Sequence, residues 1–149
     1  MRDYRRKPAM SLYTLGLNHR TAPLDVREQI AFSPDALGHA LRDLLARPKV
    51  KEAAILSTCN RTDLYSVGDG AEGAALQALR SIGGDEVEAL SYRLADHAAA
   101  LHLFRVAAGL DSLVPGEGEI LGQVRTAYEA GATGPFLNRL FHDALHAGK

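Results

Sequence analysis

The amino-acid sequence predicts an α+β domain. Short apolar runs of strand length occupy the first two thirds of the chain and alternate with stretches of helical periodicity, whereas the last third has helical periodicity only. The 149 residues are 46% hydrophobic and 23% charged, which are ordinary values for a globular domain. A chain of this length buries a real core without needing disulfide or metal crosslinks.

The predicted elements follow from local signals. Ser33 and Pro34 provide an N-cap and a first helical position, Cys59–Arg61 is a connection short enough for an antiparallel hairpin, and Gly83–Gly84 ends a helix. The first two thirds are therefore predicted to contain a strand at 11–18, a short helix from about 25, a helix at 33–46, strands at 52–58 and 62–67, a helix at 74–82 and a strand at 89–94.

The order β-α-β-β-α-β is that of a ferredoxin-like split βαβ fold, a four-stranded antiparallel sheet, which here is followed by additional helices. Asp96 is the predicted N-cap of a helix reaching about residue 108. A loop at 109–118, a helix at 119–131 and a helix from 136 to the end complete the chain. The last helix ends without a cap, so we expect this sequence to be part of a longer protein.

The charge distribution separates a short leader from the domain. Residues 1–10 carry four basic residues and one acidic residue, whereas the other 139 carry 13 basic and 17 acidic residues, a net charge of −4. We expect the leader to be disordered and the domain to span 11–149, with a sheet part at 11–94 and a helical part at 95–149. This charge argues against a stand-alone nucleic-acid clamp. No apolar run is long enough to span a bilayer.

Cys59 is the first candidate for chemistry. It is the single cysteine, so no intrachain disulfide forms, and it lies in a turn after a strand rather than within one. Arg61 lies two positions on, and a nearby guanidinium favours the nucleophilic thiolate. From these residues alone, a reactive thiol and an inert buried cysteine remain equally open alternatives.

Three other patterns are weaker. His102 lies among apolar helix residues, so it is either a core histidine or an acid/base partner of the thiol. His142 and His146 are spaced for one helix face but lack a third ligand, so no metal site is expected. The G-x-G at 116–118 follows a predicted helix rather than a strand, and it does not match a dinucleotide-binding motif.

Three strings together resemble one family. GLNHRTAPLDVRE at 16–28, STCNRTDLY at 57–65 and HLFRVAAGLDSLVPGEGEILGQV at 102–124 resemble the N-terminal catalytic domain of glutamyl-tRNA reductases over roughly 11–149. That family uses NADPH to convert glutamyl-tRNA to glutamate-1-semialdehyde, the first step of tetrapyrrole (porphyrin and heme) biosynthesis in the cytoplasm. The resemblance implies that Cys59 is the nucleophile that forms a thioester.

The resemblance also implies the remaining site residues. His102 would be the second catalytic residue, and Arg61 would pair with the substrate carboxylate through its guanidinium fork, with Arg20 as a competing assignment. The other substrate-binding positions implied are Thr58, Asn60, Ser112, Glu117, Gln123, Asn18 and His19. The sequence departs from the family pattern at Asp63, where glutamate is usual, and at Pro115 and Gly118.

The family's other parts are not found in this sequence. Its members continue into a spinal helix, an NADPH-binding domain and a dimerisation domain, so the helix from 136 is expected to begin that linker. The chain alone is expected to form and hydrolyse the thioester without completing hydride transfer. Glutamyl-tRNA and glutamate-1-semialdehyde aminotransferase are the implied partners. The alternative is a non-catalytic module that docks tRNA or a regulatory partner.

Overall fold

The fold was analysed in a computed structural model that describes residues 11–110, 119–131 and 133–147. The leader at 1–10 lies outside the described residues. The elements are, in chain order, β1 (Leu12–Asn18), α1 (Leu24–Gln29), α2 (Pro34–Leu45), β2 (Glu52–Ser57), β3 (Arg61–Val67), α3 (Ala71–Gly83), α4 (Glu86–Leu90), β4 (Tyr92–Ala95), α5 (Asp96–Ala107), α6 (Glu119–Ala130) and α7 (Pro135–Ala147).

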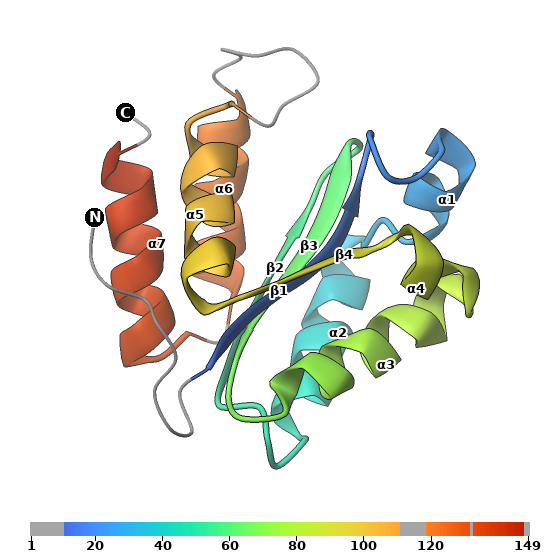
Figure 1. Cartoon of the computed structure of the whole chain (residues 1–149), viewed down its shortest axis with the longest axis horizontal. Helices are drawn as coiled ribbons and strands as arrows, with labels where there is room; N and C mark the ends of the chain where they lie inside the picture. The colour runs from blue at the N-terminus through green and yellow to red at the C-terminus, as the bar shows by residue number, and fades with distance from the viewer. Residues whose placement is uncertain (1–10, 111–118, 132, 148–149) are drawn as a thin grey trace.

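The four strands form one antiparallel sheet in the order β2-β3-β1-β4. In the central pair, Leu12 lies opposite Val67 and Asn18 lies opposite Arg61. This order and these directions are those of the split βαβ arrangement, so the ferredoxin-like prediction is confirmed. Figure 1 shows the sheet edge-on, with helices on both of its faces.

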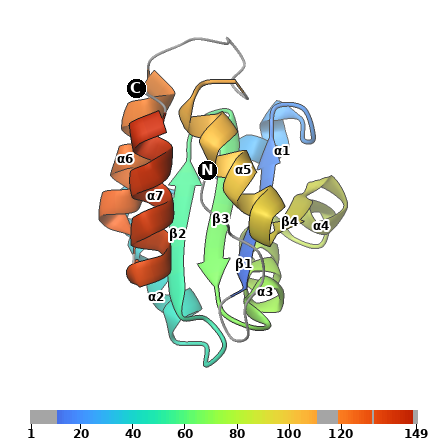
Figure 2. The same ribbon diagram turned by 60° about the vertical axis from the view of Figure 1, so that its left-hand side comes forward.

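One face of the sheet is covered by α5, α6 and α7 (Figure 2). Because side chains alternate along a strand, Tyr65 and Val67 of β3 point to this face together with Leu12 of β1. Tyr65 packs edge-on against Phe141 of α7, with ring centroids 5.7 Å apart. The prediction of three additional helices beside the sheet is therefore confirmed.

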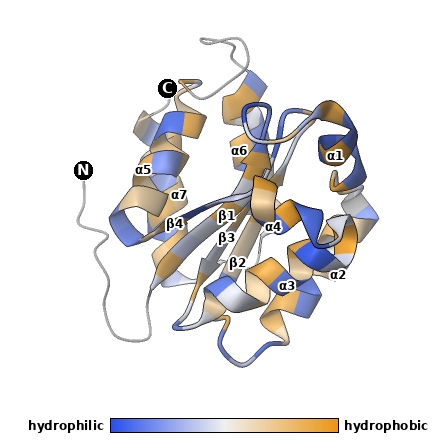
Figure 3. Ribbon diagram, turned by 45° about the vertical axis from the view of Figure 1, so that its right-hand side comes forward, coloured by the Kyte–Doolittle hydropathy of each residue, from blue (hydrophilic) through white to orange (hydrophobic). Residues whose placement is uncertain are grey.

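The opposite face is covered by α1–α4. Leu15, Leu17, Ile55 and Leu64 come from the strands and form a second core with the buried sides of these helices. Figure 3 shows hydrophobic and hydrophilic residues alternating along α2 and α3, as expected of helices with one buried side. Among the described residues, no helix is both long and apolar enough to cross a membrane.

The structure differs from the predicted elements before the last strand. Residues 89 and 90 end a short helix, α4, so β4 begins at Tyr92 rather than at 89. Val87 of α4 is fully buried in the second core, and its burial holds this segment as a helix under α3. α3 itself begins at Ala71 instead of 74.

The predicted cap at Asp96 is also wrong. Asp96 is the first residue of α5 with φ +52°, and Ala95 precedes it as N-cap without a side-chain hydrogen bond. The Asp96 carboxylate instead accepts a hydrogen bond from the backbone N–H of Leu12, 3.1 Å away. Asp96 therefore fastens the start of α5 to the start of β1.

The start of α7 is held by a carboxylate from the sheet. Glu52, at the first position of β2, is buried and accepts hydrogen bonds from the backbone N–H groups of Gly134 (2.6 Å), Phe136 (3.2 Å) and Leu137 (2.8 Å). A carboxylate suits this place because the first N–H groups of a helix lack intrahelical partners and carry partial positive charge. Glu52 therefore caps a helix more than 80 residues away in sequence.

Candidate functional site

Cys59 lies at the apex of the turn that joins β2 to β3, and it is exposed. The Thr58 hydroxyl accepts hydrogen bonds from the backbone N–H groups of Asn60 (3.1 Å) and Arg61 (3.2 Å), and the Thr58 N–H donates to the Arg61 carbonyl at 2.8 Å. Within the described part of the chain, the thiol itself makes no hydrogen bond. The turn is thus rigid while its thiol is presented to solvent, as the reactive alternative requires.

A second element fixes the same turn. Arg27 of α1 donates from Nη1 to the carbonyl oxygen of Cys59 at 3.4 Å and to Oδ1 of Asn60 at 3.3 Å. Asn60, predicted to bind substrate, therefore also contacts the scaffold. Arg27 is not among the predicted site residues, although it lies within the string at 16–28 that carries the family resemblance, 32 residues before Cys59.

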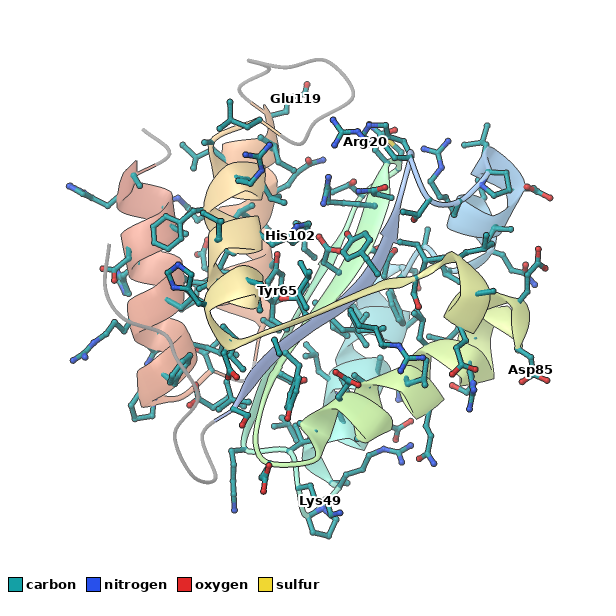
Figure 4. All side chains as sticks on the ribbon, in the orientation of Figure 1. Arg20, Lys49, Tyr65, Asp85, His102 and Glu119 are labelled. Atoms are coloured by element: carbon teal, nitrogen blue, oxygen red, sulfur yellow. The ribbon has the colours of Figure 1, made fainter. Side chains whose placement is uncertain are left out.

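The predicted loop residues lie beside the Cys59 turn, since Asn18 pairs with Arg61 across the sheet. Asn18 is buried, and its Oδ1 accepts from the N–H groups of Arg20 (2.9 Å) and Thr21 (3.2 Å), so it shapes the loop. His19 is half-buried and Arg20 is exposed. Figure 4 shows Arg20 at the same end of the sheet as the β2–β3 turn.

The most connected group of the site is Asp63, on β3. It is fully buried, and its Oδ2 lies 3.0 Å from Nη1 of Arg61 and 3.2 Å from Nε2 of His102, while its Oδ1 accepts from the Tyr92 hydroxyl. Arg61 is itself only 3% exposed and also reaches the Tyr92 hydroxyl at 3.5 Å. Four polar side chains from β3, β4 and α5 thus meet on the α5 face of the sheet.

The electrostatics of this cluster favour a carboxylate and a neutral phenol. Burial opposes ionisation of Asp63, but the hydrogen bond and charge of His102, the charge of Arg61 and the Tyr92 hydroxyl outweigh it and lower the pKa of Asp63 below 3.8. Burial and the Asp63 charge raise the pKa of Tyr92 far above its usual value. At neutral pH Asp63 is therefore an acceptor and Tyr92 a donor.

This geometry changes two expectations about Cys59. The Arg61 guanidinium is paired with the buried Asp63 carboxylate 3.0 Å away, so its charge is balanced within the chain. His102 extends from α5 toward the sheet (Figure 4), and its hydrogen-bond partner is Asp63 rather than Cys59. Both His102 and Cys59 nonetheless belong to the same end of the sheet, because Asp63, the partner of His102, is the third residue of β3 and follows Cys59 by four positions.

Gln123 lies elsewhere, on the exposed side of α6. With Glu119 and Thr126 it lines an open pocket of about 720 Å³ beside the edge strand β2, which Phe32 also lines. The pocket reaches Ser57, the last residue of β2 before the Cys59 turn. Ser112, Glu117, Pro115 and Gly118 lie outside the described residues.

A second glycine pattern lies between β3 and α3. Gly68, Gly70 and Gly73 have G-x-G-x-x-G spacing between β3 and α3, the placement of a dinucleotide-binding turn. The Gly68 N–H, however, donates to the Ser11 carbonyl at 2.9 Å, and the Ala71 N–H donates to the Gly68 carbonyl at 3.0 Å. These two backbone donors of the turn are therefore occupied within the chain.

Comparisons with known proteins identify the family. The family model described as Glutamyl-tRNAGlu reductase, N-terminal domain, matches residues 15–149. The chain belongs to this family. It is 47% identical over 148 residues to a glutamyl-tRNA reductase of Stutzerimonas stutzeri and 49% identical over 146 residues to one of Aromatoleum aromaticum, in each case over 94% of this chain and 35% of the relative.

A solved structure agrees with the fold. The glutamyl-tRNA reductase from Methanopyrus kandleri superposes with a TM-score of 0.77 at 30% identity, covering 92% of this chain and 33% of that one. The chain thus spans about a third of the length of the glutamyl-tRNA reductases that it matches. Among the residues that the structure describes in this reductase N-terminal domain, no three potential ligands gather to hold a metal ion.

Proposed function

We propose that the chain is the part of a glutamyl-tRNA reductase that forms a thioester on Cys59 from glutamyl-tRNA. The observation that carries this proposal is the exposed thiol at the apex of a turn held by Thr58 and Arg27, in a chain that belongs to the reductase N-terminal domain family. A rigidly presented nucleophile with polar groups behind it is the arrangement that acyl transfer requires.

The chemistry divides into two steps. In the first, the Cys59 thiol loses its proton, its sulfur bonds to the ester carbonyl carbon, and the carbon–oxygen bond to the terminal ribose breaks, so that the ribose hydroxyl leaves with a proton. In the second, water attacks the thioester carbon and releases glutamate with the thiol restored. His102 is the proposed acid/base group for these proton transfers.

In the whole protein the second step would be a reduction. NADPH supplies the hydride that converts the thioester to glutamate-1-semialdehyde, and we assign its binding to a part of the protein other than this chain, since the family resemblance implies a separate NADPH-binding domain. Homodimerisation and delivery of the aldehyde to glutamate-1-semialdehyde aminotransferase belong to the same proposal. The product enters tetrapyrrole biosynthesis, and the reaction takes place in the cytoplasm, where the tRNA is charged.

Recognition of the glutamyl side chain requires a cation. Arg61 is our first assignment, with Thr58, Asn60 and Gln123 as further binding positions, although Asp63 already shares its charge. Arg20 is the second assignment, because it is exposed at the same end of the sheet. Removing the cation that reads a desolvated carboxylate costs about 2–5 kcal/mol, or roughly 30- to 4,000-fold.

The test is release of glutamate from glutamyl-tRNA by the 149-residue chain. We expect Cys59→Ser to abolish it, and Cys59→Ala to do the same, while thermal unfolding of both variants matches the parent because the Cys59 side chain is exposed. Glutaminyl-tRNA as a competing substrate distinguishes Arg61→Ala from Arg20→Ala. Undiminished release by Cys59→Ser would refute the proposal, and tight binding of tRNA without any release would favour the docking module.

A further inference from the structure

The Asp63 cluster contains more than an ion pair. Arg61 and Asp63 alone neutralise each other, yet two further donors converge on the same carboxylate, from Tyr92 on β4 and His102 on α5. The Tyr92 ring also lies beside the His102 ring, with centroids 5.0 Å apart. The cluster runs from a fully buried carboxylate to a histidine whose side chain is 11% exposed.

The backbone makes room for this carboxylate. Gly16 of β1 lies directly opposite Asp63 in the sheet and directly opposite Tyr92 on its other side. A Cβ atom at Gly16 would collide with Asp63 Oδ1 and would lie 3.0 Å from the Tyr92 hydroxyl. Three neighbouring strands therefore share one space that the Asp63 carboxylate and the Tyr92 hydroxyl fill together.

The hydrogen bonds also determine the state of His102. An ionised carboxylate only accepts hydrogen bonds, so the His102 Nε2 atom, 3.2 Å from Asp63 Oδ2, carries a proton and donates it. In the neutral imidazole the Nδ1 atom then holds the lone pair, which makes Nδ1 the atom that accepts a proton. A carboxylate behind a histidine sets ring orientation and tautomer in this way at many hydrolytic and metal sites.

We propose that Asp63 is the positioning residue of His102, which it holds as the Nε2–H tautomer with Nδ1 as the proton acceptor, and that Tyr92 fixes the carboxylate by occupying its other oxygen. The catalytic role of His102 rests on the proposed function. The tautomer does not, because it follows from the hydrogen bond between His102 and Asp63 alone. It also gives Tyr92, which no sequence pattern marked, a place in the site. Neither residue needs to touch the substrate.

The first measurement requires no substrate. Nitrogen-15 NMR of the 149-residue chain reports the tautomer of each histidine ring, and His102→Gln assigns the His102 signals. We expect the Nε2–H form in the parent, a mixture of tautomers in Asp63→Asn, and the Nε2–H form restored in Asp63→Glu, which has the longer carboxylate. Glu129→Gln, at an exposed position of α6, is the control and should change nothing. An unchanged tautomer in Asp63→Asn overturns the inference.

The second measurement is glutamate release from glutamyl-tRNA. Outer-shell partners of this kind contribute about 10- to 100-fold, so we expect kcat to fall by that factor in Asp63→Asn with KM changed less than threefold. Asp63→Glu should recover most of the loss. If Cys59→Ser abolishes release while Asp63→Asn releases glutamate at the parental rate, the inference fails and the proposed function stands.

Tyr92→Phe keeps the test decisive if Asp63→Asn does not fold. It removes one hydroxyl and retains the ring, so the ring contact with His102 is kept while Asp63 loses one donor. We expect a partial shift of the tautomer and a smaller loss of kcat than in Asp63→Asn. If Tyr92→Phe keeps the parental tautomer and rate, Tyr92 does not have the proposed role. If, in addition, Asp63→Asn does not fold, that same result rejects the whole inference. If the parent releases no glutamate, the proposed function fails and the tautomer result still decides whether Asp63 orients the ring.

Discussion

Replacing Glu52 with alanine tests the capping of α7 from the sheet. The Glu52 carboxylate accepts from three backbone N–H groups at the start of α7, and it is only 4% exposed. The alanine variant leaves these donors without their acceptor in a site that water reaches poorly. It also removes a negative charge from the positive end of the helix.

The expected loss follows from these contacts. Leaving a buried donor unpaired costs about 1–3 kcal/mol, and a charge near a helix terminus contributes roughly 0.3–2 kcal/mol. Because the three donors share one carboxylate and relax together, we expect about 3–5 kcal/mol rather than the full sum. A domain of this size has a total stability of about 5–15 kcal/mol, so the midpoint of thermal unfolding should fall by roughly 10 °C or more.

Urea unfolding followed by circular dichroism measures this loss. Glu52→Gln should lie between the parent and Glu52→Ala, since its amide retains one acceptor oxygen and turns an NH₂ group toward the helix. Glu129→Ala, at an exposed glutamate of α6, is the matched control and should stay within about 0.5 kcal/mol of the parent. A Glu52→Ala variant as stable as this control would refute the capping argument.

Two further predictions concern the Asp63 cluster. Gly16→Ala should destabilise the chain by about 1–3 kcal/mol or more in urea unfolding, because the new methyl would lie 2.6 Å from the Thr62 carbonyl and against the Asp63 carboxylate. Gly73→Ala is the control: its methyl meets no atom within 4 Å, so the variant should be neutral or stabilising. Equal effects at both glycines would contradict this prediction. Since the folded-state pKa of Asp63 lies below 3.8, its stabilising contribution is complete above the unfolded-state value near 4 and is lost as the pH falls through the lower folded-state value. The parent should therefore lose stability on acidification below about pH 4 more steeply than Asp63→Asn, and parallel pH profiles would show that the cluster does not favour ionised Asp63.

The sheet and its helices were predictable because their signals are local and periodic. Leucines at strand spacing, a Ser-Pro helix start and a short Cys59–Arg61 connection each indicate one element, and the order of the elements then selects the ferredoxin-like topology. α4 was missed because a five-residue helix is shorter than the window in which periodicity is read. A single apolar residue such as Val87 fits a buried strand as well as a buried helix, so the sequence does not distinguish the two before its packing in the second core is known.

The site was predictable only in part. Cys59 and its turn are contiguous in sequence, so their placement followed from the hairpin. Tyr92 and His102 follow Asp63 by 29 and 39 residues, respectively. Only the sheet position of β4 and the packing of α5 bring their polar atoms to the Asp63 carboxylate. Arg61 differs from these, because it lies two residues before Asp63 on β3 and strand alternation places both side chains on one face, so this ion pair could be predicted from the sequence.

The long-range cap at Glu52 also constrains the order of folding. Closing a loop of more than 80 residues is entropically slow, so the contact between β2 and α7 forms after the hairpin and the local helices. During synthesis from the N-terminus, the face of the sheet that carries Tyr65 is not covered by Leu137, Leu140 and Phe141 until α7 has been made. A chain ending before α7 would keep this apolar face exposed, and self-association would compete with folding. Packing of α7 on this face of the sheet therefore removes the main site of self-association from the nascent domain.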